Sequence, residues 1–166
     1  MPSSTPLGEN RLLQRTTCAD LTRLKPHLTK IRMATGKVLH PAGTPIEHVY
    51  FPLGGMVSLL AVMKSGEQIE TAITGREGVV GASVGIDGAF SNGQATVQAD
   101  GPAWQITSAR FLDVYNTSAS FRSLMNRYLG VRRSRAPPAT PSTRWNRDCA
   151  AGCCRRRTWW RATWSI

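Results

Sequence analysis

Glycine and proline residues are spaced so closely between residues 36 and 101 that they leave no room for a long helix. Only short runs remain between them, which is typical of an antiparallel all-β unit with a turn at the end of each strand. The residues that break the chain in this way are Gly36, Pro41, Gly43, Pro45, Pro52, Gly54, Gly55, Gly66, Gly75, Gly78, Gly81, Gly85, Gly88, Gly93 and Gly101.

The runs between these breaks are rich in β-branched and aromatic residues, which predicts strands. Residues 64–67 form a short, glycine-containing connection, so we expect the strands on either side of it to pair as a hairpin. Asp100 and Gly101 predict a second hairpin of the same kind. The predicted strands are residues 38–39, 48–51, 56–63, 68–73, 94–99 and 103–107.

Helices are expected on either side of this β unit. Thr17 followed by Asp20 has the form of a capping box, and Pro26 ends the short helix that it opens. After Ser118 or Ser120 the apolar spacing changes to that of an amphipathic helix, which we expect to end near Gly130. Its apolar stripe consists of Phe121, Leu124, Met125, Tyr128 and Leu129.

The formal net charge of +11 is concentrated at one end of the chain. After residue 129 arginine is frequent, tryptophan recurs and Asp148 is the only acidic residue, while residues 135–141 are rich in proline. Because aliphatic residues are scarce there, we expect residues 131–166 to be disordered. One explanation is a basic, aromatic segment that binds nucleic acid. The other, which we favour, is a shift of the coding frame near residue 130, since out-of-frame translation of a GC-rich gene gives such a composition.

Several function classes have little support in the sequence. There is no long apolar run and no signal-like N-terminus, so we expect a cytoplasmic protein. His27, His40 and His48 lack metal-site spacing and are interpreted as partly exposed loop or strand residues, and Cys18 is the only cysteine before the tail. No nucleophile–base or paired-carboxylate arrangement stands out, so we expect no enzyme activity and no bound metal.

Residues 75–81, with the sequence Gly-Arg-Glu-Gly-Val-Val-Gly, are the most informative local motif. Glycines at a turn before a short helix let backbone N–H groups converge on a phosphate or carboxylate. The same glycines are equally compatible with simple turn geometry. Both interpretations remain open on the residues alone.

Three ordered blocks, residues 36–45, 48–60 and 75–81, resemble the effector domain of the Crp/Fnr family of bacterial transcription regulators. The resemblance extends from about residue 10 to residue 129. It implies a mainly β fold with flanking helices: a cyclic-nucleotide-binding-type, jelly-roll-like β-roll, short N-terminal helices and a truncated C-terminal dimerisation helix. In the family that helix leads into a helix-turn-helix DNA-binding domain, which we do not find in this chain.

The resemblance also implies a candidate effector pocket for a small anionic or nucleotide-like molecule. Nucleotide-binding members place an Arg on the strand after the glycine motif, to pair with the cyclic phosphate. Here Gly93 takes that position, so we expect no binding of cyclic AMP in the usual way. The candidate pocket residues are Gly75, Glu77, Gly78, Gly81, Gln94, Ala95 and Thr96. Arg76 is expected to be solvated.

The sequence thus predicts four segments: residues 1–15, a β-roll at 16–117, the start of a dimerisation helix at 118–130, and the tail at 131–166. Phe121, Leu124, Met125 and Tyr128 are the candidate homodimer interface implied by the family, the alternative being packing against the chain's own roll. The predicted function is effector sensing and dimerisation in a transcription regulator whose full-length relatives bind DNA. The alternative is non-specific nucleic-acid binding through the Arg/Trp-rich tail.

Overall fold

The computed structural model describes residues 9–63, 67–86, 91 and 93–135. The chain divides into two units, Met1–Ala136 and Pro137–Ile166, and the second lies wholly outside the described residues, as does most of the predicted tail. The elements are α1 (Arg11–Gln14), α2 (Cys18–Leu24), the 3-10 helix η1 (Lys25–His27), β1 (Thr29–Met33), β2 (Val38–His40), β3 (His48–Pro52), β4 (Met56–Val62), β5 (Gln68–Thr74), the 3-10 helix η2 (Ala82–Gly85), β6 (Gln94–Ala99), β7 (Gly101–Thr107), α3 (Ser108–Thr117) and α4 (Ala119–Arg135).

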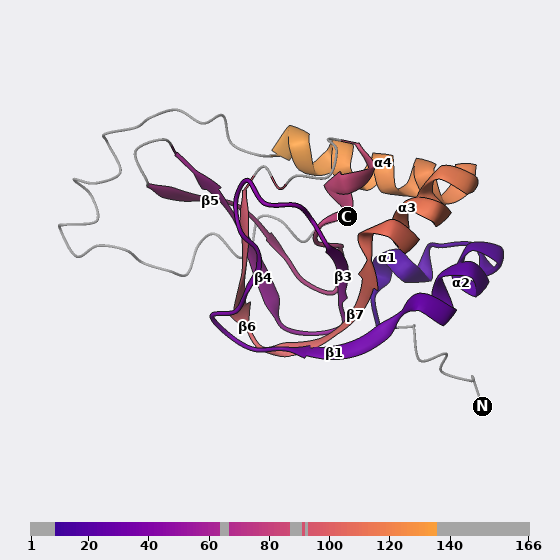
Figure 1. Ribbon diagram of the computed structural model, residues 1–166, viewed down its shortest axis with the longest axis horizontal. Coiled ribbons are helices and arrows are strands. Elements are labelled where there is room, and N and C mark those ends of the chain that lie inside the picture. The colour runs from indigo at the N-terminus through magenta and orange to yellow at the C-terminus, as the bar shows by residue number, and fades with distance from the viewer. Residues whose placement is uncertain (1–8, 64–66, 87–90, 92, 136–166) are drawn as a thin grey trace. The chain divides into compact units, whose positions relative to one another are not determined.

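The strands form two antiparallel sheets, in the orders β1-β7-β3 and β2-β6-β4-β5 (Figure 1). Apolar side chains from both sheets share one buried cluster, which therefore lies between them. The predicted jelly-roll-like β-roll is confirmed. The buried members of this inner cluster are Met33, Tyr50, Val57, Val80, Ala95, Val97 and Ala103.

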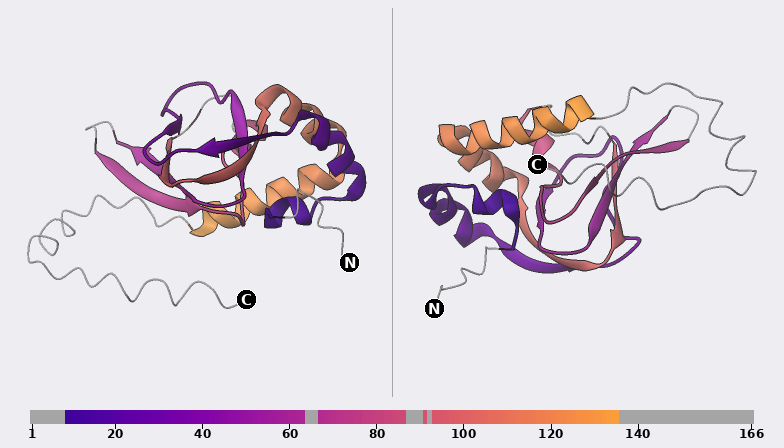
Figure 2. Two further views of the ribbon diagram at one scale, coloured as in Figure 1. Left: turned by 90° about the horizontal axis from the view of Figure 1, so that it is seen from below. Right: turned by 180° about the vertical axis from the view of Figure 1, so that it is seen from behind.

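The opposite face of the β1-β7-β3 sheet packs against the helices. Because side chains alternate along a strand, Val49 and Phe51 of β3 face the helices while Tyr50 faces the inner cluster. Phe111 of α3 and Phe121 of α4 fill this second cluster in a T-shaped pair with ring centroids 5.5 Å apart. Figure 2 shows α1, α2 and α3 grouped at one end of the roll, with α4 running from this group along the roll.

The first predicted hairpin is confirmed and the second is wrong. Strands β4 and β5 pair directly. Strands β6 and β7 instead belong to different sheets, and the chain crosses between the sheets at Asp100. A Cβ on Gly101 would lie 2.4 Å from the carbonyl carbon of Gly54, so this glycine permits a close backbone approach between loops.

Helix α2 begins with the expected capping box. The Asp20 N–H donates to Thr17 Oγ1 at 3.3 Å, and Thr17 Oγ1 donates to the Asp20 carboxylate at 2.7 Å. Ser120 of α4 donates to the same carboxylate oxygen at 2.6 Å. Asp20 is buried, so these bonds connect the start of α2 to the start of α4 through one carboxylate.

Two features of the C-terminal helices differ from the prediction. Helix α3 was not expected, although Phe111, Val114 and Tyr115 have helical spacing and are buried. Helix α4 does not end at Gly130 but continues to Arg135. A glycine costs a helix only about 1 kcal/mol, and the disfavoured conformation before Pro137 is a stronger reason for the helix to end.

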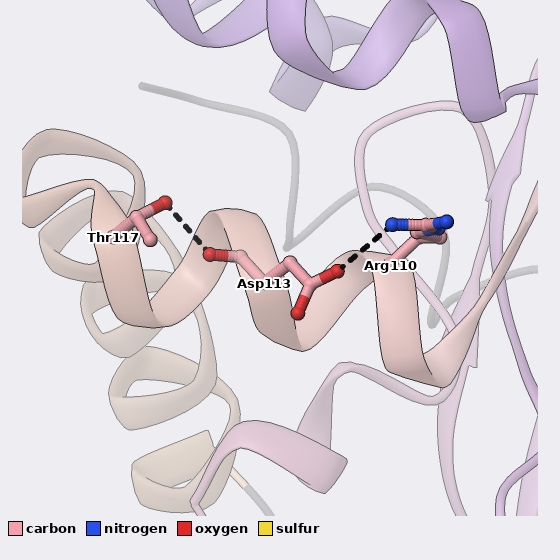
Figure 3. Close-up of polar contacts among 3 residues, drawn as sticks. All are labelled: Arg110, Asp113 and Thr117. Atoms are coloured by element: carbon pink, nitrogen blue, oxygen red, sulfur yellow. Dashed lines mark hydrogen bonds and ion pairs between the residues drawn. The ribbon is translucent and has the colours of Figure 1, made fainter.

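The exposed side of α3 is ordinary solvated surface (Figure 3). Arg110 Nη1 lies 3.4 Å from Asp113 Oδ2, and both side chains are more than half exposed, so the pair contributes little to stability. Thr117 Oγ1 donates to the Asp113 carbonyl at 2.7 Å near the end of the helix. Among the described residues, no helix is both long and apolar enough to cross a membrane.

Candidate functional site

The glycine motif forms a tight turn that its own glutamate stabilises. The Gly75 N–H donates to Glu77 Oε1 at 2.8 Å, and the Gly78 N–H donates to the Gly75 carbonyl at 3.1 Å. Val80 and Tyr50 exchange two backbone hydrogen bonds, of 2.9 and 2.8 Å, which attach the end of the turn to β3. Glu77 therefore has a structural task already, whether or not an effector is bound.

A second attachment comes from Asn10, which the sequence analysis missed. Asn10 is buried at the start of α1, where its Oδ1 accepts hydrogen bonds from the Leu12 and Leu13 N–H groups. Its Nδ2 donates to the carbonyls of Pro52 and Gly78 at 2.8 and 2.9 Å. An Asn two residues before an apolar pair, here Leu12 and Leu13, is compatible with a helix start, so sequence could have identified its capping role but not its bond to the turn.

Gly81 ends the turn with a backbone that few other residues adopt. Its φ is +87°, and it directly precedes η2. A Cβ at this position would lie 2.8 Å from His40 Nε2 and 2.9 Å from the His48 carbonyl oxygen. Glycine is therefore required here for both backbone conformation and space.

His40 is the ionisable side chain that faces this turn from the inside of the roll. It is only 4% exposed, which corrects the expectation that it is partly exposed. Its Nε2 has no hydrogen-bond partner among the described residues. Burial, with a smaller contribution from the charge of His48, lowers the pKa of His40 from 6.5 to about 4, so the imidazole is neutral at neutral pH.

The three candidate residues on β6 do not share one environment. Ala95 is buried in the inner cluster and lies opposite His40 in the β2–β6 ladder. Gln94 and Thr96 have the opposite orientation, and Gln94 Nε2 donates to Thr96 Oγ1 at 3.0 Å. The structure thus brings Ala95 toward Gly81 through His40, and it leaves the side chains of Gln94 and Thr96 on the other face of the sheet.

Helix α4 contacts the turn through Tyr128. The Tyr128 hydroxyl accepts a hydrogen bond from the Val79 N–H at 3.3 Å. A Cβ on Gly78 would lie 2.1 Å from this hydroxyl oxygen, so the glycine provides the space that the tyrosine occupies.

The other end of the same segment is connected to α4 through α3. The Tyr115 ring lies against Gly85, where an added Cβ would be 3.0 to 3.2 Å from three ring carbons. The Tyr115 hydroxyl in turn donates to Asn126 Oδ1 of α4 at 2.6 Å. Two tyrosines therefore connect residues 78–85 to one helix.

Two of the four candidate interface residues pack inside the chain instead. Phe121 is 1% exposed and Met125 is fully buried, both in the cluster between the helices and the sheet. Neither side chain is available to a second copy, because the roll itself covers that part of the stripe. Leu124 and Tyr128 are partly buried and stay candidates.

Basic residues are absent from the stretch of sequence that follows the glycine turn. No Lys, Arg or His occurs between Arg76 and Arg110 in the sequence. Arg76 is exposed, as expected, and its carbonyl accepts a hydrogen bond from the Arg11 N–H at 2.8 Å. Within the described part of the chain, no group of three or more His, Cys, Asp or Glu side chains is placed to hold a metal ion.

Comparison with known families identifies the fold and the class of protein. The family described as "Cyclic nucleotide-binding domain" matches residues 30–118, a segment that contains the glycine turn, His40 and all of β6. The chain belongs to this family. A sequence comparison with curated proteins gives no match.

Solved structures with the same fold include bacterial regulators. CLP of Xanthomonas campestris, described as a c-di-GMP-responsive global regulator, superposes with a TM-score of 0.60 at 18% identity, over 72% of this chain and 60% of that one. The sensor domain of the transcriptional regulator DNR from Pseudomonas aeruginosa superposes with a TM-score of 0.61 at 14% identity, over 76% of this chain and 85% of that one. The catabolite activator protein of Thermus thermophilus superposes with a TM-score of 0.57 at 14% identity, over 86% of this chain and 61% of that one.

These similarities confirm the β-roll and show that this chain resembles Crp/Fnr-type effector domains in fold. At such identities they establish the fold alone. The chain spans 60% of the length of CLP.

Proposed function

We propose that this chain is a non-enzymatic, effector-sensing and dimerising domain of a Crp/Fnr-type transcription regulator. The observation that carries the proposal is the Tyr128 hydroxyl of α4, which lies on Gly78 and accepts the Val79 N–H. The glycine turn and the helix cannot move independently while this contact persists. In a domain that matches the cyclic nucleotide-binding family, the turn is where an effector would act.

The proposed output is a shift in the population of α4 positions. An effector that binds one arrangement of residues 75–85 more tightly favours that arrangement, and it can shift the equilibrium only by its difference in affinity for the two. Tyr128 transmits the change directly, and Tyr115 transmits it through Asn126. A second copy of the chain would sense α4 through the partly exposed residues Leu124 and Tyr128.

We further propose that cyclic AMP is not bound through the usual guanidinium–phosphate pair. Gly93 stands where that pairing needs an Arg, and an added Cβ there would lie 2.5 Å from the Leu60 carbonyl oxygen. A charge-assisted hydrogen bond contributes about 1.5 to 3 kcal/mol, so its loss weakens phosphate binding by at least tenfold.

Thermal unfolding of the full chain with added ligands tests this function. Suitable ligands are cyclic AMP, cyclic GMP, cyclic di-GMP, adenosine, guanosine and inorganic phosphate. A true effector at a hundredfold excess over its Kd stabilises the folded state by about 2.7 kcal/mol, which is visible as a raised midpoint. The proposal predicts such a rise for at least one of the nucleosides or cyclic nucleotides, and no rise with any of them contradicts it.

The alternative, nucleic-acid binding, rests on the arginines and tryptophans after residue 129. It predicts that the full chain binds single-stranded DNA of any sequence, with an affinity that falls steeply as salt is raised. Our proposal predicts no appreciable binding at physiological salt. A fluorescence titration with a labelled oligonucleotide separates the two.

A further inference from the structure

One peptide group of the glycine turn is held by two helices that are far apart in the sequence. The Gly78 carbonyl accepts a hydrogen bond from Asn10 Nδ2, at the start of α1, at 2.9 Å. The N–H of the same peptide group, which belongs to Val79, donates to the Tyr128 hydroxyl of α4 at 3.3 Å. The oxygen and the hydrogen of one planar amide therefore connect the turn to both helices.

Asn10 is fully buried, and every hydrogen-bonding position of its side-chain amide is used. Its Oδ1 accepts from the Leu12 and Leu13 N–H groups at 3.0 and 3.1 Å, which caps α1. Its Nδ2 donates to the carbonyls of Gly78 and Pro52. Reversing the amide would place an acceptor against two carbonyl oxygens, so this network also fixes the orientation of the side chain.

The capping role alone does not require an asparagine. Asn, Asp and Ser cap helices about equally well, but an ionised Asp has no donor and a Ser has only one, on a shorter side chain. The backbone adds a parallel attachment, because the Arg11 N–H donates to the Arg76 carbonyl at 2.8 Å. Helix α1 is thus bonded to the turn at two points.

The two hydrogen bonds on this peptide group strengthen each other. A hydrogen bond to a carbonyl polarises the peptide group and makes its N–H a better donor. The bond from Asn10 therefore strengthens the bond to Tyr128, and the reverse also holds. Because the peptide group is planar and stiff, a displacement of the turn that changes one bond also changes the other.

We propose that Asn10 is a positioning residue of the glycine turn, and that α1 and α4 respond to the turn jointly through the Gly78–Val79 peptide group. Helix α1 is then a second element that responds to an effector, and whatever restrains α1 alters the turn in return. The role of the effector in this inference rests on the proposed function. The coupling itself can be measured without a ligand.

Asn10→Ser and Asn10→Asp separate positioning from capping. Both keep an oxygen that caps α1 and both lose the amide donor, while the aspartate also directs a charge at two carbonyl oxygens. In nitrogen–proton NMR of the full, ligand-free chain, we expect the Val79 amide and the α4 amides around Tyr128 to shift in both variants, and more in Asn10→Asp. Unfolding midpoints show whether each variant is folded, and Asn10→Ser alone decides if the aspartate variant is not.

Thr71→Val is the matched control. It also removes a hydrogen bond from a side chain to a carbonyl, that of Leu59 at 3.0 Å, but on the β4–β5 hairpin. It should leave the Val79 and α4 amide resonances unchanged. A general loss of stability would affect the control and Asn10→Ser alike, so only the latter reports on the turn.

Urea unfolding of Asn10→Ser, Tyr128→Phe and the double variant measures the coupling. Tyr128→Phe removes the hydroxyl that accepts the Val79 N–H. We expect the rise in the unfolding equilibrium constant of the double variant to fall short of the product of the two single rises by more than about twofold. The combination of Thr71→Val with Tyr128→Phe should give the product itself.

The outcomes distinguish this inference from the proposed function. A double variant within about twofold of the product, or unshifted α4 amides in Asn10→Ser, overturns the inference and leaves effector sensing intact. With any ligand that raises the unfolding midpoint, the inference also predicts altered amide exchange at Leu12 and Leu13. Altered exchange at the turn and α4 but not at α1 overturns the inference, whereas altered exchange at the turn and at neither helix contradicts the proposed function.

Discussion

Buried neutral His40 makes the stability of this fold depend on pH in a window set by its pKa. In the folded chain this pKa is about 4, against 6.5 for an ordinary histidine. Between these values the unfolded chain binds a proton that the folded chain does not, so stability falls as the pH is lowered. A tenfold difference in proton affinity corresponds to about 1.4 kcal/mol, so neutral His40 contributes roughly 3 kcal/mol to the free energy of unfolding that is lost between the two pKa values.

Urea unfolding followed by circular dichroism measures this quantity directly. Between pH 7 and pH 4.5, His40 alone should remove roughly 2 kcal/mol from the free energy of unfolding. Carboxylates also titrate near pH 4, so the informative value is the difference between wild type and His40→Leu over the same range. The leucine variant should lose less stability than the wild type by about that amount, while His27→Gln, at an exposed position, should follow the wild type.

Parallel loss of stability in the wild type and His40→Leu would refute this reasoning. It would mean that His40 takes up its proton in the folded state, through solvent access or a partner anion.

Three further predictions concern packing and the buried carboxylate. Gly78→Ala should destabilise the chain by roughly 1 to 3 kcal/mol, because the new methyl group meets the Tyr128 hydroxyl, and adding Tyr128→Phe should recover part of the loss in a double-mutant cycle by urea unfolding. Gly81→Ala should lower the thermal unfolding midpoint more than Gly36→Ala does, because both glycines have positive φ but only a Cβ on Gly81 would meet neighbouring atoms. An equal decrease in midpoint for the two variants would argue against the contact between Gly81 and the His40 imidazole. Burial raises the pKa of Asp20, but hydrogen bonds from neighbouring hydroxyls outweigh it and leave the pKa below its ordinary value of 3.8. Asp20→Asn should therefore lower the free energy of unfolding by about 2 kcal/mol at neutral pH, and the difference in free energy of unfolding between wild type and variant should decrease as the pH falls below 3.8. A difference that does not change with pH would exclude the ionised carboxylate as its cause.

Local sequence predicted the parts of this fold that local chemistry determines. Turn residues separate the strands, so the β4–β5 hairpin and the capping box at Thr17 were correctly predicted. Ordered motifs identified the β-roll and its glycine turn. These features depend on residues that are close together in the sequence, so they can be recognised from the sequence of one chain.

The features of the fold that the sequence did not predict depend on contacts between residues far apart in the sequence. The crossing between β6 and β7 depends on Gly101 meeting Gly54, a contact between distant loops. Helix α3 follows β7 with no glycine or proline between them, so no turn residue marks the change of periodicity. The inward turn of His40 comes from a register shift that no residue type announces, and the burial of Phe121 and Met125 depends on which side of α4 the roll covers.

The most direct test of the account is amide hydrogen exchange of the full chain, with and without a ligand that raises the unfolding midpoint. The account predicts altered exchange at Val79 and along α4 from Ala119 to Gly130, and loss of the α4 response in Tyr128→Phe while Val79 still responds. A stabilising ligand that alters exchange at the glycine turn but leaves α4 unchanged in the wild type would contradict it.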